Sequence, residues 1–99
     1  MTKPPNHLSP EMKRFWGGIL KDFELESDAL LVLRTACEQW DRAQQAREVL
    51  AQEGITLNGK KHAAIDVEKQ AVGLFLRSMR QLGLDIVAPG SGQPLGRRI

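Results

Sequence analysis

The chain has 99 residues, of which 41% are hydrophobic and 26% are charged. This length allows one domain and excludes two, and the composition is that of an ordinary soluble protein, neither disordered nor membrane-spanning. The formal net charge is +2, but residues 9–85 contain eleven Lys and Arg against all twelve Asp and Glu, a net charge of −1. The composition therefore gives no sign of the basic face that a strong monomeric nucleic-acid binder usually carries.

The N-terminal residues and the single cysteine indicate the compartment. The sequence begins without the apolar core of a signal peptide, and no apolar run approaches the roughly 18 residues that a membrane span needs. Cys37 has no second cysteine with which to form an internal disulfide, which agrees with a reducing environment. We therefore expect an intracellular protein with no membrane partner.

The first predicted helix covers residues 10–22. Residues 1–8 contain two prolines and lack periodicity, so we expect a disordered arm before the helix. Ser9-Pro10 is typical of an N-cap followed by proline at the first helical position. Gly17-Gly18 weakens this helix by about 1 kcal/mol per glycine relative to alanine, and we expect the pair to permit close packing. The apolar residues at helical spacing are Met12, Phe15, Trp16, Ile19 and Leu20.

A second, much longer helix is predicted from residues 27–28 to Gly54. This stretch lacks proline and glycine, which gives a helix of about 27 residues and ~40 Å. Gly54 followed by an apolar residue is typical of a helix C-cap. The apolar arc is wider than one partner helix requires, and Gln44 and Arg47 interrupt it, so we expect a polar or subunit interface there. The arc consists of Leu30, Leu33, Ala36, Cys37, Trp40, Ala43 and Leu50.

A short turn then leads into a third helix. Asn58-Gly59 between an alternating segment and a basic one predicts a type I′ turn, and hence a short β-hairpin or an ordered loop over residues 55–62. The third helix begins at residues 64–66 and ends at Gly83, again a plausible C-cap. The predicted fold class is all-α: one helix plus a long antiparallel helical hairpin, with a flexible, Gly- and Pro-rich tail over residues 86–99.

The third helix carries more apolar surface than three helices of one chain can easily bury. Two apolar stripes run along it and together cover more than half of its surface. Self-association is the economical explanation, so we predict a homo-oligomer. The candidate interface residues are Ile65, Val72, Leu76 and Met79 on this helix, together with Gln44 and Arg47 on the second.

The sequence offers little for catalysis, cofactor binding or metal binding. Two distant histidines and one cysteine lack the spacing of a metal site, and His62 is expected to be a loop residue. Cys37 falls on an apolar stripe, where a buried thiol is inert. We predict a protein without catalytic residues, cofactor or small-molecule substrate, in which Trp16 and Trp40 are core anchors. A small enzyme stays possible if Cys37 or the acids Glu24, Glu26 and Asp28, expected to cap the second helix, line a pocket.

Three pairs of basic residues are the remaining functional candidates. Each pair alone is more often solvated surface than a binding site, but a ring of many copies would repeat each pair around its rim and build a field that a monomer lacks. The candidate DNA contacts are Lys13 and Arg14 on the first helix, Lys60 and Lys61 in the hairpin, and Arg97 and Arg98 in the tail.

Several segments, in order and at their spacing, resemble a small-subunit family of tailed-phage DNA-packaging terminases. No single piece is specific, but the combined pattern spans about residues 7–85, most of the chain. The segments are His7-Leu8-Ser9-Pro10-Glu11-Met12, Phe15-Trp16, Ala36-Cys37-Glu38-Gln39-Trp40-Asp41-Arg42-Ala43, Leu50-Ala51-Gln52-Glu53-Gly54, His62-Ala63-Ala64 and Leu82-Gly83-Leu84.

The resemblance implies a non-catalytic subunit that forms a ring and recognises the start site of the viral DNA in the host cytoplasm. It would then deliver this DNA to the large subunit, which holds the ATPase and the nuclease. By analogy with related systems, the tail would tether the large subunit. This chain departs from the family at Ala63, where proline is common, and it lacks a separate helix-turn-helix domain. We therefore expect recognition through phosphates and DNA shape. The alternative is a helical protein-interaction adaptor that does not bind DNA.

Overall fold

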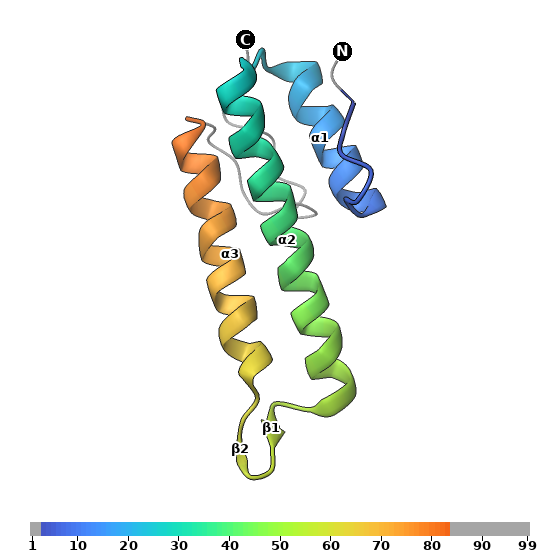
Figure 1. Cartoon of the computed structure of the whole chain (residues 1–99), viewed down its shortest axis with the longest axis vertical. Helices are drawn as coiled ribbons and strands as arrows, with labels where there is room; N and C mark the ends of the chain where they lie inside the picture. Colours follow the sequence, from blue (N-terminus) through green and yellow to red (C-terminus); the bar gives the residue numbers. More distant parts are fainter. Residues whose placement is uncertain (1–2, 84–99) are drawn as a thin grey trace.

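The computed structural model describes residues 3–83 and confirms the all-α prediction (Figure 1). Helices α2 and α3 lie side by side and antiparallel, and a two-stranded hairpin joins them at one end of the molecule. Helix α1 packs along the half of α2 that is distant from this hairpin. The elements are α1 (Pro10–Asp22), α2 (Ser27–Glu53), β1 (Thr56–Leu57), β2 (Lys60–Lys61) and α3 (Ala63–Gln81).

Three helix boundaries are formed by the residues that the sequence indicated, one at the start of α1 and one each after α2 and α3. The Ser9 hydroxyl accepts a hydrogen bond from the Met12 backbone N–H at 3.2 Å, so Ser9 caps α1. Gly54 has φ +83° after the last turn of α2, and Gly83 has φ +74° after α3, a backbone region that glycine enters without steric cost. Helix α3 begins at Ala63, slightly earlier than predicted.

The hairpin between α2 and α3 is a tight antiparallel turn. Thr56 pairs with Lys61 and Leu57 with Lys60, which leaves Asn58 and Gly59 as the two loop residues. Both have positive φ, 54° and 76°, as a type I′ turn requires. The Asn-Gly signal therefore predicted both the place and the type of the turn.

The hydrophobic core lies where all three helices meet. Trp40 of α2 packs on Phe75 of α3 with ring centroids 5.1 Å apart, and Phe15 of α1 lies 6.0 Å from the same ring. Trp16 and Trp40 are both buried, as predicted for core anchors. The core consists of Leu8, Met12, Trp16, Ile19, Phe23, Leu33, Ala36, Cys37, Trp40, Phe75 and Met79.

Beyond α1, the two long helices pack through small residues. The half of α2 and α3 nearest the hairpin has no third helix over it (Figure 1). Small side chains are buried here, which lets the two backbones approach closely with little apolar volume between them. These residues are Ala43, Ala46, Ala64 and Ala71.

None of the helices within residues 3–83 combines the length and the apolar composition that a membrane span requires.

Two expectations for the N-terminal part need correction. Residues 6–8 form a turn, and Leu8 is buried in the core, so ordered structure begins before the predicted helix start. The reason is a set of contacts to α2 that a one-dimensional pattern does not reveal, such as His7 Nε2 to Glu38 Oε2 at 2.7 Å. Gly17 and Gly18 do not mediate close packing within the described residues, because a Cβ atom at either would meet nothing within 4 Å.

Candidate nucleic-acid interface

The β1–β2 hairpin places Lys60 and Lys61 at one extreme end of the molecule (Figure 1). Both lysines are exposed. The Lys61 amine donates to Asp66 Oδ1 at 2.9 Å across the start of α3, whereas Lys60 has no ion-pair partner among residues 3–83. Lys60 therefore has the less compensated charge of the two.

The register of the hairpin directs the two lysines to opposite faces. Successive residues of a strand point to opposite sides, so Lys60 shares a face with Leu57, and Lys61 shares the other with Thr56. Leu57 is 48% exposed, so the first face combines a cation with an exposed apolar side chain. The two lysines thus lie on opposite faces, and the Lys61 amine is engaged by Asp66 whereas the Lys60 amine is unpaired among residues 3–83.

The base of the hairpin is organised by His62. This residue is buried, its backbone N–H donates to the Ile55 carbonyl at 2.9 Å, and its ring contacts both Glu53 and the start of α3. The sequence predicted an ordinary loop residue here. The position of a single histidine carries no signal of its tertiary contacts, although its place just before a helix could have indicated a cap.

The other basic candidates lie apart from the hairpin. Lys13 and Arg14 are on α1, which sits against the opposite half of α2, so one copy does not gather the two pairs into one patch (Figure 1). Arg97 and Arg98 lie outside the described residues, as does the tail over residues 86–99. Within one described chain, the hairpin pair is thus the candidate that projects furthest from the helical body.

The candidate oligomer residues on α3 divide into surface and core. Ile65 and Val72 are partly buried, and Leu76 is 36% exposed, so all three offer apolar surface. Met79 is only 2% exposed because it packs in the core of its own chain, so its side chain offers almost no surface to a second copy. Met79 is therefore a correction to the predicted interface.

The two polar candidates on α2 differ in their contacts. Arg47 forms an ion pair with Glu68 of α3, and its guanidinium lies 6.0 Å from the centroid of the Trp40 ring, so it ties α2 to α3 within the chain. Gln44 is partly buried, and its Nε2 is a buried donor without a hydrogen-bond partner among the described residues. An unpaired buried amide costs free energy, and because this nitrogen is buried within its own chain it offers no surface to a second copy.

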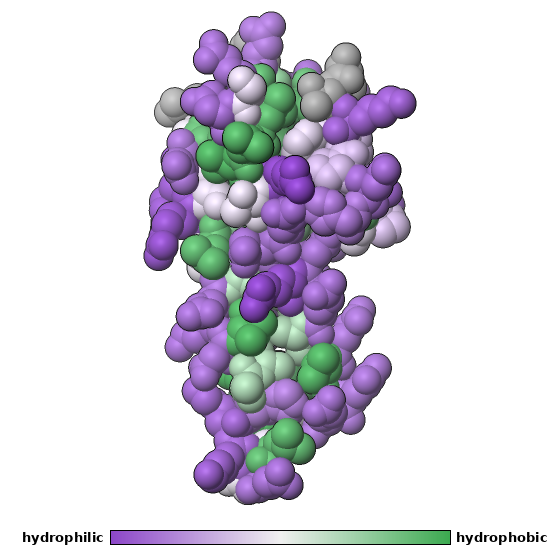
Figure 2. Space-filling view, viewed as in Figure 1, coloured by the Kyte–Doolittle hydropathy of each residue, from purple (hydrophilic) through white to green (hydrophobic). Residues whose placement is uncertain are grey.

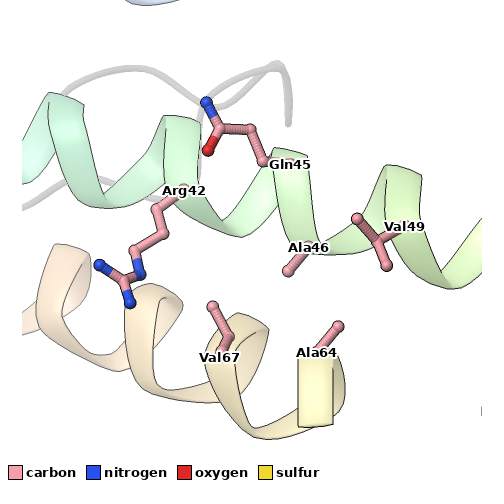
Figure 3. Close-up of a pocket in the computed structure, with 6 residues that line it drawn as sticks. All are labelled: Arg42, Gln45, Ala46, Val49, Ala64 and Val67. Atoms are coloured by element: carbon pink, nitrogen blue, oxygen red, sulfur yellow. The ribbon is translucent and has the colours of Figure 1, made fainter. Parts of the chain in front are cut away.

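A shallow apolar groove runs between α2 and α3 near the hairpin (Figure 3). Ala46 and Val49 of α2 point across it toward Ala64 and Val67 of α3, and Arg42 reaches over one end. Figure 2 shows separate hydrophobic patches on the lower half of the molecule, framed by hydrophilic side chains, and a larger hydrophobic area at the top. The helical pair thus presents apolar surface that its own α1 leaves uncovered.

Cys37 is buried in the core, as the apolar stripe predicted. Burial, reinforced by the charges of Asp41 and Glu38, raises the pKa of the Cys37 thiol to about 12. A thiol with this pKa is a poor nucleophile at neutral pH.

The acidic side chains do not form a metal site in the part of the chain that the structure describes. Glu24, Glu26 and Asp28 lie at the connection between α1 and α2, where Asp28 Oδ1 accepts from the Ala29 N–H at 3.0 Å. Residues 3–83 contain no group of three or more His, Cys, Asp or Glu placed to hold a metal ion.

Comparison with known proteins gives no relative from which a function could be transferred. No family model, no curated protein and no solved structure matches this chain.

Proposed function

We propose that this chain is the small, non-catalytic subunit of a viral DNA-packaging terminase. In this role it assembles with copies of itself, binds the start site of the viral DNA, and delivers the DNA to the large subunit. The proposal places the protein in the cytoplasm of the infected host. The observation that carries the structural part of the proposal is the projecting hairpin, whose second strand is Lys60–Lys61.

The shape of the hairpin supports DNA contact through the backbone of the duplex. Lys60 and Lys61 lie on opposite faces of the hairpin, so Lys60, which has no ion-pair partner among residues 3–83, can meet a phosphate directly, and Lys61 can do so once its amine leaves Asp66. Neither hairpin strand is longer than two residues, so there is little surface for reading a series of base edges. Contacts of this kind fix position and respond to DNA shape more than to base identity.

Self-association is the second part of the proposal. Ile65, Val72 and Leu76 leave apolar surface on α3. One chain adds only a few positive charges to DNA, and several copies in a ring would add their hairpins in a repeated array. Arg97 and Arg98 would contribute further phosphate contacts, and the tail over residues 86–99 would tether the large subunit.

A helical protein-interaction adaptor without DNA contact is the second candidate. The apolar groove lined by Ala46, Val49, Ala64 and Val67 favours it, because such grooves accept helices of a partner. The near-neutral charge of residues 9–85 favours it as well. Under this alternative the hairpin lysines do not contact DNA and only keep the surface soluble.

Binding of labelled double-stranded DNA over a series of salt concentrations separates the two candidates. We expect wild-type protein to bind at low salt, and the double substitution Lys60→Ala and Lys61→Ala to weaken binding. If each amine meets one phosphate in every bound copy, the double substitution should make the negative slope of log K against log salt less steep by about 2 per copy. The control is Lys69→Ala with Arg77→Ala, which removes the same charge from exposed positions of α3.

Two results would count against DNA recognition by the hairpin. Equal weakening by both double substitutions would show a response to net charge alone. If wild-type protein does not bind DNA even at low salt, yet binds a protein partner tightly, the adaptor function replaces the terminase function.

A further inference from the structure

His62 connects three elements through four hydrogen bonds. Its backbone N–H donates to the Ile55 carbonyl at 2.9 Å, and its carbonyl accepts from the Ile65 N–H at 3.1 Å. Its ring Nδ1 accepts from the Ala64 N–H at 2.9 Å, and its Nε2 lies 2.9 Å from Glu53 Oε1. Only 11% of the side chain is exposed, whereas the hairpin around it is exposed throughout.

These contacts assign the protonation of the ring. A backbone N–H can only donate, so Nδ1 must hold a free lone pair toward Ala64. The proton of the neutral imidazole is therefore on Nε2, where it is donated to the Glu53 carboxylate. The ring acts at once as the N-cap of α3 and as a donor to the end of α2.

The ring joins the two points at which the hairpin segment leaves and enters the helices. Glu53 is the last residue of α2, and His62 immediately precedes α3, so residues 54–61 form a loop whose ends meet at one imidazole. A two-stranded hairpin with two residues in each strand is not stable by itself. Its direction relative to the helices depends on how its base is held.

We infer that His62, through its hydrogen bond to Glu53, is a positioning residue that orients the Lys60–Lys61 hairpin for binding phosphates. This inference rests on the proposed DNA-binding function. Because the base of the hairpin is already fixed in the free protein, the hairpin loses less conformational entropy when it binds a ligand. The charged side chain that contacts the ring is that of Glu53, at the end of α2.

The simpler role is that His62 only caps α3, and two substitutions separate the roles. His62→Asn keeps a side-chain oxygen that can cap the helix, since asparagine is among the best N-caps, but its short amide does not reach Glu53. Glu53→Ala leaves the cap untouched and removes the acceptor of the Nε2 proton. Glu53→Gln keeps an acceptor oxygen and loses the charge.

The sign of the Glu53 effect makes the DNA-binding test decisive. Removing a negative charge near a phosphate-binding hairpin should tighten binding if only electrostatics counts. Positioning predicts the opposite for Glu53→Ala, a weakening of about five- to tenfold, with a similar loss for His62→Asn and no further loss in the double variant. Glu53→Gln should bind at least as tightly as wild type.

Measurements on the free protein keep this inference distinct from the proposed function. Nitrogen-15 NMR of the His62 ring should show Nδ1 unprotonated and Nε2 protonated at neutral pH. Amide exchange of the His62 N–H, which is bonded to Ile55, should accelerate in Glu53→Ala but not in Glu53→Gln.

The outcomes can be assigned separately. If wild-type protein binds DNA and depends on Lys60 and Lys61, but His62→Asn binds equally well and Glu53→Ala binds more tightly, the positioning role is wrong and the proposed function stands. If wild-type protein does not bind DNA, the proposed function fails. In that case unchanged amide exchange in Glu53→Ala would also reject the orienting role.

Discussion

The carboxylate of Asp41 in α2 accepts two hydrogen bonds from Ser9, one from its backbone N–H at 2.8 Å and one from its hydroxyl at 2.6 Å. The same hydroxyl oxygen accepts from the Met12 N–H, so the residue that caps α1 is itself fixed to α2. Within the first turn of α1, Glu11 Oε1 accepts from the Trp40 indole N–H at 3.1 Å. These bonds set the position of α1 over the hydrophobic core.

Asp41→Ala should therefore destabilise the fold. The substitution leaves the Ser9 N–H and hydroxyl without their acceptor in a partly buried place, which costs about 1–3 kcal/mol. Thermal unfolding at a fixed protein concentration should show a melting temperature at least about 4 °C lower. Glu48→Ala, which removes an exposed carboxylate from the same helix, is the control and should change little. Equal stability of the two variants would show that the link to Ser9 is not needed.

Cys37 should be almost unreactive in the folded protein. Because the pKa of its thiol is raised to about 12, very little thiolate exists at neutral pH, and the sulfur is also buried. A disulfide reagent such as dithiobisnitrobenzoate should react at least roughly a hundredfold more slowly in buffer than in urea, because reaction requires opening of the core. Rapid labelling of the folded protein would instead revive the small-enzyme alternative.

The same thiol makes the fold sensitive to alkali. In the unfolded chain Cys37 ionises near its ordinary pKa of 9.0, whereas in the folded chain it stays protonated up to about pH 12. The unfolded chain therefore releases the thiol proton at a lower pH than the folded chain does. The contribution of this thiol to the free energy of unfolding is present below pH 9 and is lost as the pH rises from 9 to 12. Urea unfolding in this range should show a steeper decline for wild type than for Cys37→Ala. Parallel declines would contradict the raised pKa.

The oligomer interface can be tested with two leucines of equal exposure. Leu76 and Leu74 are 36% and 38% exposed and lie two positions apart on α3, on opposite flanks of the buried Phe75. We expect Leu76→Asp to reduce the native mass and Leu74→Asp to leave it unchanged, because only the flank with Ile65 and Val72 is the proposed contact. Circular dichroism checks that both variants stay folded. Dissociation by Leu74→Asp alone would move the interface to the other flank.

Helix ends and the turn could be predicted from sequence because their causes are local. Ser9 before a proline, the glycine at position 54 and the Asn58-Gly59 pair act within a few residues of themselves, through capping bonds and positive φ. The apolar stripe of α2 likewise placed Cys37 and Trp40 in the core, since helical spacing determines which residues share a face.

Contacts between distant residues could not be predicted in this way. Nothing near Ser9 indicates that its partner is Asp41, 32 residues away, and nothing near His62 indicates Glu53. The burial of Leu8 depends on the same tertiary links. Met79 belongs to the apolar stripe predicted as an interface but is buried in the core of its own chain, because periodicity identifies an apolar face but not which part of a wide face the other helices of the same chain cover.

The candidate DNA site was predicted only in part. The basic pair of Lys60 and Lys61 and the turn that carries it are visible in the sequence. Three features emerge only from the three-dimensional arrangement. These are the projection of the hairpin from the end of α2 and α3, the placement of the two lysines on opposite faces, and the hydrogen bond between His62 and Glu53 at the base of the hairpin.

The native mass of the purified protein tests whether the chain assembles into a ring. Light scattering on a sizing column, over a range of protein and salt concentrations, compares the assembled species with the 11.0 kDa chain. We expect a discrete species well above a dimer, as a ring of DNA-binding subunits requires. A monomer or dimer under every condition, with or without DNA, would contradict it.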